Sequence, residues 1–363
     1  MESGIANASN ALTNCSKQFP TLASGFEACE RFEYSYDREL VEKIVMVVVP
    51  LFFGMIGILG LAGNSLVVVV VAANAGMRST TNILIINLAV ADLLFVIFCI
   101  PFTATDFVLP YWPFGNVWCK IVQYLIIVTA YASVYTLVLM SLDRYLAVVH
   151  PIASMSWRTE HHAILAICVA WVLILALSTP ALVIHGEIHY LFQEIEDVTL
   201  TKNLTACRII AQYDWTTFQV SFFLTSYVLP LVLICIFYMC MLVRLWRGTR
   251  VSAESRRGRK RVTRLVFVVV GVFAACWCPL QVILVIKSLD IYPLTTATIM
   301  VQIASHILAY MNSCVNPFLY AFLSDNFRKA FWKLIYCRPR AEPNNRLEPA
   351  TRTTRAASSG DIL

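Results

Sequence analysis

One carboxylate, Asp92, lies in the middle of a long apolar stretch of the chain, where an unpaired charge would be costly. Polar residues occur at similar depth in three other apolar stretches: Asn64, Ser133, Asn312, Ser313 and Asn316. Their oxygens suit a hard cation, so this set could hold one sodium ion, with Asp92 as its only charged ligand. The alternative is a water-filled polar network that joins the helices without an ion.

Two other pairs of reactive side chains do not suggest catalysis. His161 and His162 are adjacent, and Cys276 and Cys278 flank a tryptophan inside an apolar stretch. Neither pair has the spacing of a metal site or of a nucleophile with its base. The sequence therefore predicts no enzyme activity, and no cofactor apart from the sodium ion considered above.

Seven apolar stretches must position Asp92 and its neighbours. A bilayer core about 30 Å thick needs roughly 20 apolar residues per helix, because each residue adds about 1.5 Å. The stretches are 44–73, 81–105, 121–142, 163–184, 215–243, 265–286 and 291–324, and Asp92 and His306 are the only acid or base in them. With 59% hydrophobic and 14% charged residues, the chain is predicted to be an all-α membrane protein with a seven-transmembrane helix bundle.

Charge orders the connecting segments. Nine Lys or Arg residues and one acid lie between positions 244 and 264, and five more bases lie at positions 328–340, after the last span. The first 43 residues hold seven acids and four bases, and the loop 185–214 holds five acids and two bases. Because basic segments stay in the cytosol, we expect a multi-pass plasma-membrane protein with its amino end outside and its carboxyl end inside. The net charge of +6 is assigned to this orientation, and no nucleic-acid partner is expected.

Four segments follow from this pattern. They are an extracellular, largely disordered tail (1–43), a membrane domain (44–324), a short amphipathic eighth helix (325–337) and a disordered cytoplasmic tail (338–363). Glycosylation sequons at Asn7, Asn14 and Asn203 all fall in segments that are predicted to be outside. The amino end has no basic region followed by an apolar one, so we expect the first span to direct insertion.

The chain has 12 cysteines, and the seven that lie within spans are expected to be packing residues. Four others are predicted to face the oxidising compartment: Cys15, Cys29, Cys119 and Cys207. A bond between Cys119 and Cys207 would tether the long outer loop over the bundle, which leaves Cys15 and Cys29 as a second pair. Cys337 follows the amphipathic stretch and is either a palmitoylation site or a free thiol.

Short motifs in successive spans resemble those of the rhodopsin-like G-protein-coupled receptors, over about residues 44 to 337. The motifs are Gly63 with Asn64, the run 88–92, Cys119, Asp143 with Arg144 and Tyr145, Trp171, Pro230 with Tyr238, Cys276 with Trp277 and Pro279, and Asn316 with Pro317 and Tyr320. Each motif alone is common, but their order along the chain is specific. Prolines inside several spans, including those in these motifs, are expected to kink the helices.

The resemblance implies a switch at the inner end of the third span. Asp143 would neutralise Arg144 in the resting state and release it toward Tyr238 and the G protein on activation. Many relatives carry an acid at the inner end of the sixth helix, where this chain has Arg259. Thr263 could offer only a neutral hydrogen bond, so we expect a resting state that is held less firmly.

The same resemblance implies a path from the ligand to this switch. Trp277, next to the kink at Pro279, would respond to ligand contact and swing the inner half of the sixth helix outward. Tyr320, which follows Asn316 and Pro317, would then turn inward and help to hold the open state.

The class of ligand can be narrowed by residues that particular branches of the family need. Amine receptors use an aspartate where this chain has Ile126, and retinal-binding members use a lysine where it has Tyr310. The outer segments are instead rich in acids and aromatics: Asp106, Glu187, Glu194, Glu196, Asp197, Asp214, Tyr111, Trp112, Phe114, Tyr213 and Trp215. Such a surface suits a basic or amidated peptide.

Within the family, the runs 111–115 and 134–151 look like those of the galanin receptor group and, inside it, of insect allatostatin-A receptors. Galanin receptors usually have a histidine directly after the proline where Leu280 and Gln281 follow Pro279 here. The likeness implies a neuropeptide that ends in Phe-Gly-Leu-amide and coupling to inhibitory (Gi/o) G proteins. A galanin-like or other peptide receptor is the alternative.

The candidate ligand-binding residues project from the outer parts of the spans: Asp106, Gln123, Ile127, Gln219, Gln281, Gln302 and His306. Amide and imidazole groups can bind a terminal carboxamide, although each could instead make an interhelical hydrogen bond. Further partners are expected at the other end, where the basic segment 244–264 would favour anionic lipid. Phosphates on the tail would bind arrestin, at Thr351, Thr353, Thr354, Ser358 and Ser359.

A channel or secondary transporter is the remote alternative. Either would want several ionisable groups near the midplane or an inverted repeat that relates the two halves. The sequence has one such acid, Asp92, and no such repeat.

Overall fold

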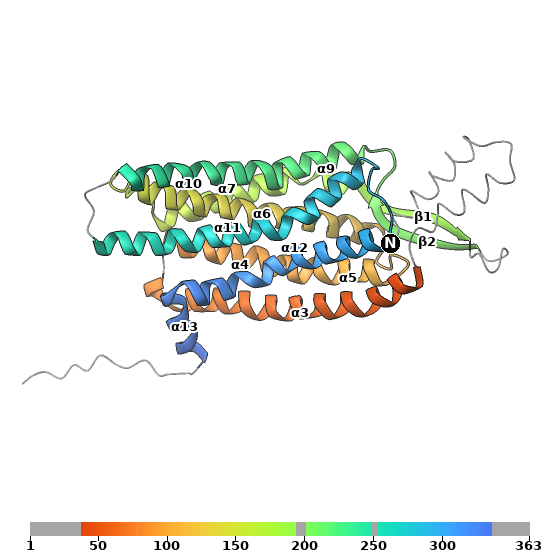
Figure 1. The fold of residues 1–363 in the computed structure, drawn as a ribbon, viewed down its shortest axis with the longest axis horizontal. Coiled ribbons are helices and arrows are strands. Elements are labelled where there is room, and N and C mark those ends of the chain that lie inside the picture. Colours follow the sequence, from red (N-terminus) through yellow and green to blue (C-terminus); the bar gives the residue numbers. More distant parts are fainter. Residues whose placement is uncertain (1–37, 78, 194–200, 248–252, 336–363) are drawn as a thin grey trace, which may run out of the picture.

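The computed structural model describes residues 38–77, 79–193, 201–247 and 253–335. Seven helical segments there are long and apolar enough to cross a membrane: Leu40–Ala73, Thr80–Val108, Gly115–Val149, Glu160–Ile184, Trp215–Arg244, Arg264–Ser288 and Thr296–Leu323. They lie side by side and run roughly along one common direction (Figure 1). The predicted seven-transmembrane helix bundle is confirmed.

Several spans are built from more than one element. The helices are α3 (Arg38–Ala73), α4 (Thr80–Phe98), α5 (Ile100–Val108), α6 (Gly115–Val149), α7 (Glu160–Leu177), α8 (Pro180–Ile184), α9 (Trp215–Phe223), α10 (Leu229–Arg247), α11 (Ala253–Ser288), α12 (Thr296–Leu323) and α13 (Asp325–Ile335). A short 3₁₀ turn, η1 (Ala75–Met77), follows α3, and a π-helical turn, η2 (Leu224–Val228), joins α9 to α10.

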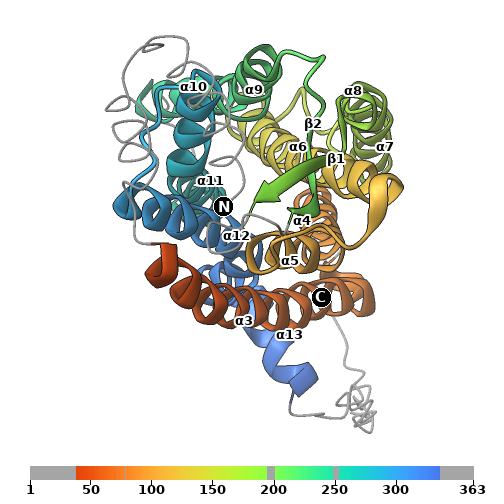
Figure 2. The same cartoon turned by 90° about the vertical axis from the view of Figure 1, so that its right-hand side faces the viewer.

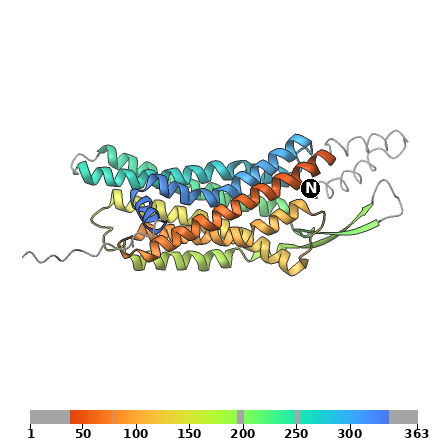
Figure 3. The same cartoon turned by 90° about the horizontal axis from the view of Figure 1, so that it is seen from below.

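A two-stranded sheet stands at one end of the bundle, and the sequence pattern did not predict it. Strands β1 (His185–Gln193) and β2 (Thr201–Ile209) pair antiparallel, with Glu187 opposite Cys207. We call this end the hairpin end, and the opposite end, where α13 crosses the bundle, the α13 end (Figures 1 and 3). Figure 2 views the bundle from the hairpin end and shows β1 and β2 extending over the helix ends.

The third span, α6, is the most enclosed. In its most apolar window 61% of the residues are buried inside the protein, compared with 17% in the span that contains α7 and α8. Accordingly, α7 and α8 lie at the edge of the bundle in Figure 2. Residues of α6 are therefore placed to contact most other spans, at both the hairpin end and the α13 end of the bundle.

Proline explains the interruptions of three spans. Pro101, Pro180 and Pro230 lie at or next to the first residues of α5, α8 and α10, because proline cannot donate the backbone hydrogen bond that would continue the preceding helix. By contrast, α3, α11 and α12 continue through Pro50, Pro279 and Pro317.

Side chains of another helix stabilise the π-helical turn before Pro230. Tyr135 of α6 donates its hydroxyl to the Thr225 carbonyl at 3.0 Å, and the hydroxyls of Tyr131 and Thr225 lie 2.7 Å apart. A π-helical turn disturbs the regular hydrogen-bond ladder, and these side chains satisfy groups that the ladder leaves out.

Helices α3 and α12 approach closely because Gly63 has no side chain. A Cβ atom at Gly63 would lie 2.9 Å from Cγ of Pro317. The contact is held by Asn64, whose Nδ2 donates to the carbonyls of Gly60 (3.0 Å) and Ser313 (2.8 Å). Small residues at such crossings let helix backbones pack in a membrane.

Several predicted span boundaries were wrong. The first helix begins at Arg38 instead of 44, because its first turns are helical although they are charged. The seventh begins at Thr296 instead of 291, because Thr295 and Thr298 form a reciprocal cap at that point. The third extends from Gly115 to Val149, well beyond the apolar run 121–142.

The eighth helix is present as α13, over Asp325–Ile335. Phe327 and Phe331 are buried, and Phe327 packs against Tyr320 of α12 with ring centroids 5.5 Å apart. Predictions for Asn7, Asn14, Cys15, Cys29, Cys337 and the phosphorylated tail lie outside the described residues, and Asn203 lies in β2.

The cysteines within the spans are free thiols, but only three of them pack inside the protein. Cys99, Cys276 and Cys314 are buried, whereas Cys168, Cys235, Cys240 and Cys278 are exposed on the bundle surface. The expectation that all seven are packing residues was therefore wrong, since an apolar sequence does not distinguish a lipid-facing position from a core position.

Candidate functional site

Asp92 of α4 lies at the centre of a buried polar network. The residue is fully buried, and its Oδ2 accepts a hydrogen bond from Asn316 Nδ2 at 2.8 Å. Its Oδ1 lies 3.5 Å from Ser133 Oγ, and the Ser313 hydroxyl is also within reach of the carboxylate. The structure thus brings together α4, α6 and α12 as the sequence predicted.

Unpaired oxygens around this carboxylate are suited to a cation or to water. Among the described residues, the side-chain oxygens of Asn64, Asn312 and Asn316 are buried and have no hydrogen-bond partner. Buried polar atoms rarely stay unpaired. One carboxylate with neutral amide and hydroxyl oxygens is a donor set that fits a hard monovalent ion such as sodium.

Trp277 lies on α11, two residues before Pro279. Its indole packs on Phe273 with ring centroids 6.1 Å apart, and among the described residues its Nε1 has no hydrogen-bond partner. The side chain is buried, and its indole N–H is not used in a hydrogen bond to another described residue. It can therefore change rotamer without breaking a hydrogen bond to another described side chain.

At the α13 end, Asp143 pairs with Arg144, as predicted. The guanidinium contacts Asp143 Oδ2 through Nη2 and through Nε, the latter at 3.0 Å. Thr81 of α4 donates its hydroxyl to the same oxygen at 2.9 Å and also contacts Arg144. A second guanidinium, that of Arg158 in the loop between α6 and α7, donates to Oδ1 at 2.9 Å. The sequence did not predict Thr81 or Arg158, because neither belongs to a motif.

The predicted switch tyrosines make no hydrogen bond to Asp143 or Arg144 among the described residues. Tyr145 lies 3.4 Å from His150 through its hydroxyl, and Tyr238 packs edge-on against Phe267. Tyr320 is fully buried against α13. Among the described residues, the hydroxyls of Tyr238 and Tyr320 have no hydrogen-bond partner. The side chains of Arg259 and Thr263 lie outside the described part of the chain.

A cavity of about 560 Å³ opens beside the Asp143 pair. Its lining includes Arg144 and Arg158, with Leu265 of α11 and Phe327 of α13 on the apolar side. The guanidinium of Arg144 therefore faces a space at the α13 end of the bundle.

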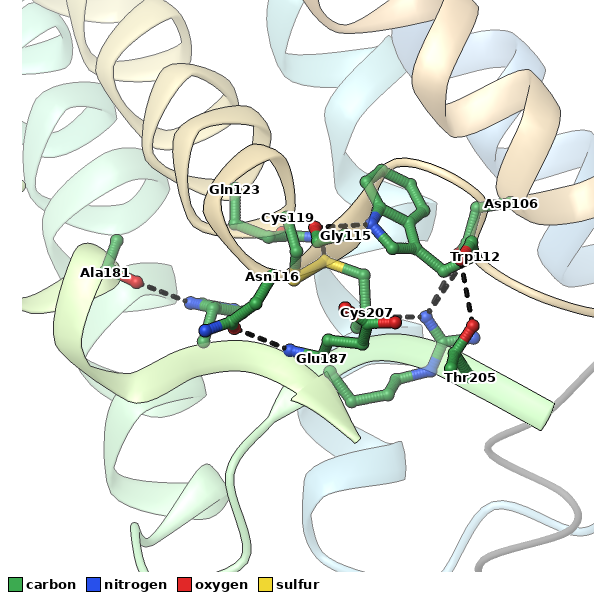
Figure 4. The surroundings of a disulfide bond; sticks show 12 residues. Asp106, Trp112, Gly115, Asn116, Cys119, Gln123, Ala181, Glu187, Thr205 and Cys207 are labelled. Carbon is green, nitrogen blue, oxygen red and sulfur yellow. Dashed lines mark hydrogen bonds and ion pairs between the residues drawn. A yellow bond between two sulfur atoms is a disulfide. The ribbon is translucent and has the colours of Figure 1, made fainter. Parts of the chain in front are cut away.

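At the hairpin end, the predicted disulfide between Cys119 and Cys207 is present, with the Cα atoms 5.5 Å apart. It joins the start of α6 to β2 (Figure 4). Next to it, the backbone N–H of Trp112 donates to the Thr205 carbonyl at 2.8 Å, and the indole donates to the Gly115 carbonyl at 3.0 Å. The hairpin is thus fixed to the top of α6 and to the segment before it.

An ion pair also joins the hairpin to α5. Arg208, the residue after the disulfide, donates to Asp106 Oδ2 at 3.0 Å. On the other side of the disulfide, the backbone N–H of Glu187 donates to Asn116 Oδ1 at 3.0 Å (Figure 4). Asp106, which was predicted to contact the ligand, is therefore already paired inside the protein.

His185, the first residue of β1, is a buried histidine outside the spans. Its Nδ1 lies 3.0 Å from the Ala181 carbonyl, and its ring packs edge-on against Phe218. Burial lowers the pKa of His185 to about 4, so the imidazole is neutral near pH 7.

Four of the predicted ligand-binding residues fall into two groups. Gln302 and His306 lie one turn apart on α12, where His306 packs against Phe107 of α5 and its Nδ1 lies 2.9 Å from the Gln302 carbonyl. Gln219 and Gln281 are buried on the α9 and α11 side, where Gln281 lies 3.4 Å from Ser226.

Two further predicted residues lie on α6. Gln123 is half-buried beside Cys207, with its Nε2 3.8 Å from Sγ, and Ile127 is buried one turn below. Ile127 can offer only apolar contact.

A small cavity of about 30 Å³ lies beside Gln302 of α12. One of its lining residues was not predicted from the sequence. Lys287, in the last turn of α11, lines it and donates to Gln302 Oε1 at 3.2 Å. In the sequence, the only sign of this site is that Lys287 is a single base directly after a long apolar run. The remaining lining residues are Val41, Val45, Phe107, Asp290, Tyr292, Leu294, Ile299, Gln302 and Ile303.

Comparison with known proteins agrees with this geometry. The family described as 7 transmembrane receptor (rhodopsin family) matches residues 63–320. The chain is 62% identical over 326 residues to the allatostatin-A receptor of Bombyx mori, covering 88% of each chain. It is 38% identical over 312 residues to the human galanin receptor type 1, covering 83% of this chain and 84% of that one. It is 36% identical over 332 residues to the somatostatin receptor type 5 of Bos taurus, covering 87% and 88%. These relatives are receptors and not enzymes, and the chain belongs to the rhodopsin family of seven-transmembrane, G-protein-coupled receptors, in the group of the allatostatin-A and galanin receptors.

Proposed function

We propose that the chain is a plasma-membrane receptor for a neuropeptide of the allatostatin-A type, ending in Phe-Gly-Leu-amide, and that it couples to inhibitory (Gi/o) G proteins. The observation that carries the ligand class is the 62% identity, over 88% of both chains, to a protein named as an allatostatin-A receptor. The basic loops at the α13 end and the acidic ones at the hairpin end support an outward-facing hairpin.

The hairpin end offers polar groups that suit the terminal amide of a peptide. Gln302, His306 and Lys287 lie together beside a cavity, with Phe107 as an apolar wall. A primary carboxamide both donates and accepts hydrogen bonds, and the two amide groups of Gln302 and Gln281 can do the same. Asp106 would contact a basic group of the ligand only after exchanging its pairing with Arg208.

The signal would pass through the centre of the bundle. Contact of the peptide with the hairpin end of α11 would shift Trp277, whose indole N–H is unpaired among the described residues. The kink at Pro279 would turn this shift into a movement of the α13 end of α11. Release of Arg144 from Asp143 would follow, and Arg144 could then contact Tyr238 or the G protein. Tyr320 would leave its packing against Phe327 and turn inward.

We further propose that the Asp92 network binds one sodium ion in the resting state. Ser133, Ser313 and Asn316 contact the carboxylate, and the unpaired amide oxygens of Asn64, Asn312 and Asn316 support the assignment. An ion there would stabilise the arrangement of α4, α6 and α12 that exists before activation. A water cluster is the competing occupant.

Further partners and modifications are proposed at both ends. The basic segment 244–264 would bind anionic lipid, the phosphorylated tail would bind arrestin, and Cys337 would carry a palmitoyl chain next to α13. Sugars at Asn7, Asn14 and Asn203 would mark the outer side.

The test of the ligand is nucleotide exchange on purified Gi/o by the receptor in lipid nanodiscs. A Phe-Gly-Leu-amide peptide should stimulate exchange at nanomolar concentration, and the same peptide with a free carboxylate should be at least about ten-fold weaker, since one lost hydrogen bond to a neutral group is worth about 1.4 kcal/mol. Stimulation by galanin and not by this peptide would favour the galanin-like alternative, and no exchange with either would reject the proposed ligand.

The test of the site uses α12. Gln302→Ala and His306→Ala should each lower peptide potency about ten-fold, whereas Val301→Ala, an exposed neighbour of Gln302 on the same helix, should not. Unchanged potency in both variants would move the site to the group around Gln219 and Gln281.

A further inference from the structure

Asp143 is bound by two guanidiniums, and each takes a different oxygen of the carboxylate. Arg144 donates from Nε to Oδ2 at 3.0 Å, and Arg158 donates from Nε to Oδ1 at 2.9 Å. The Asp143 side chain is 4% exposed, so its charge depends on these partners. The pair with Arg158 is separate from the pair with Arg144 and can persist without it.

Arg158 is held in place by its own backbone. Its N–H donates to the Ser154 carbonyl at 2.8 Å, and its carbonyl accepts from Thr80 Oγ1 at 3.2 Å. Ser154 is buried and donates from Oγ to the Leu146 carbonyl of α6 at 3.1 Å. The loop that carries Arg158 is therefore fixed to α6 and to the start of α4, and none of these contacts involves α11.

The proposed activation requires Arg144 to leave a buried carboxylate. A buried carboxylate that loses its only cation is strongly disfavoured, and it responds by taking up a proton. With Arg158 still bound at Oδ1, Asp143 keeps one cation and, from Thr81, one hydroxyl donor at Oδ2. The release of Arg144 then leaves a paired carboxylate.

We propose that Arg158 is a positioning residue for activation: it stays with Asp143 when Arg144 leaves, so that the carboxylate stays ionised and the release of Arg144 requires no proton. This inference rests on the proposed function, in which Arg144 moves toward the G protein. It also accounts for a receptor that has a base, Arg259, where many relatives have an acid. Among the described residues, Asp143 is the acid that holds Arg144, and it is shared with Arg158.

Other titratable groups near Asp143 must be separated from its own titration. Tyr145 and His150 lie on or just after α6, Tyr238 lies on α10, and Arg264 lies on α11. On the α7 side the titratable residues are Glu160, His161 and His162. α4 contributes only hydroxyls and an amide beside the carboxylate, and Ser324 and Phe327 line the cavity from the α12 and α13 side. The three histidines are retained in every variant below, so any effect of theirs cancels in a ratio to the wild type.

The experiment is agonist-stimulated nucleotide exchange by the receptor in nanodiscs, measured from pH 6 to pH 8. In Arg158→Gln, the release of Arg144 should need one proton, so activity relative to wild type should fall as pH rises, approaching a limit of about ten-fold per pH unit for a one-proton step. Arg158→Lys keeps a cation and should restore the flat ratio. Asp143→Asn combined with Arg158→Gln removes the carboxylate and should also give a flat ratio.

A ratio for Arg158→Gln that does not change with pH would overturn the proposal, and so would a steep ratio for Arg158→Lys. If Arg158→Gln only unfolded the loop, activity would fall by the same factor at every pH, and that result would also contradict the proposal. A fluorescent label at Gly271, an exposed position of α11 where a side chain would meet no atom within 4 Å, reports the movement of this helix without G protein and should show the same pH dependence. If no peptide activates the wild type, the proposed ligand fails, while the pH dependence of basal exchange still tests Arg158.

Discussion

At the residue scale, the chemistry that could be predicted from sequence is the chemistry of rare residues. Asp92 was identifiable because it is the only acid in the seven predicted spans, and Asp143 with Arg144 because they end one of those spans. Arg158 and Lys287 were missed, because a base in a loop or at a helix end is ordinary and only the folded chain places it beside a carboxylate or a cavity. The pairing of Asp106 with Arg208 was missed for the same reason.

Replacing Asp92 tests the ion. Asp92→Asn should leave agonist affinity unchanged or higher and abolish its dependence on sodium, because the charge that attracts the ion is gone. In the wild type, replacing potassium by sodium should lower agonist affinity about five-fold or more, the lower range of typical coupling between two sites. The measurement is radioligand competition at constant ionic strength, and a wild-type affinity that does not respond to sodium would reject the ion site.

His185 should make the hairpin end sensitive to acid. Its pKa in the folded protein is about 4, below the usual 6.5, so the contribution of this histidine to stability is complete above pH 6.5 and is lost as pH falls toward 4. The difference of roughly 2.5 units corresponds to at most about 3 kcal/mol.

The thermal midpoint of the receptor in nanodiscs should therefore fall between pH 7 and pH 4.5, and His185→Gln should reduce that fall. His189→Gln is the matched control, since His189 lies on the same strand and is exposed. Equal acid sensitivity in the wild type and in His185→Gln would show that the histidine is not the responsible group.

At the element scale, the spans followed from hydropathy, but their internal breaks and the hairpin did not. Neither β1 nor β2 shows a regular alternation of apolar and polar residues along its whole length, so the sequence predicted a loop where the structure has paired strands. The π-helical turn η2 depends on Tyr131 and Tyr135 from another helix, and a local pattern cannot report such support. Helix ends were misplaced wherever a cap or a charged first turn extended or shortened the apolar run.

The contact of α3 with α12 should be intolerant of a methyl group. Gly63→Ala would place a Cβ 2.9 Å from the rigid ring of Pro317, so we expect a loss of about 1–3 kcal/mol in stability and a lower thermal midpoint. Gly57→Ala on the same helix is the control, because a Cβ there would meet no atom within 4 Å. A midpoint for Gly63→Ala that equals that of Gly57→Ala would show that the helices can separate without cost.

At the scale of the whole molecule, the two ends of the bundle have opposite chemical character. The hairpin end is fixed by a disulfide, an ion pair and backbone hydrogen bonds, whereas the α13 end depends on one shared carboxylate beside a cavity of about 560 Å³. Composition and loop charge predicted this polarity and the seven spans. They could not predict which groups the bundle leaves unpaired, since that depends on packing between helices far apart in sequence.

The carboxyl-terminal tail is predicted to end signalling. Deleting residues 350–363 removes Thr351, Thr353, Thr354, Ser358 and Ser359, and with them the phosphates that would bind the basic surface of arrestin. Signalling should last longer and internalisation should fall, with ligand affinity unchanged. Alanine at the five hydroxyl positions in the full-length chain is the matched control and should have the same effect, and arrestin recruitment that persists in both would place the phosphorylated element elsewhere.

The disulfide between Cys119 and Cys207 also imposes an order on the biosynthesis of the receptor. The two cysteines are 88 residues apart, and α6, α7, α8 and β1 lie between them or include the first. At a translation rate of about 5–20 residues per second, Cys119 waits roughly 4–18 s for its partner. During that time Cys15 and Cys29 are already made and are predicted to enter the same compartment. A bond between Cys119 and either early cysteine would have to be reshuffled by an isomerase before Cys119 could pair with Cys207, so the yield of receptor with the native bond depends on the oxidative folding machinery of the host.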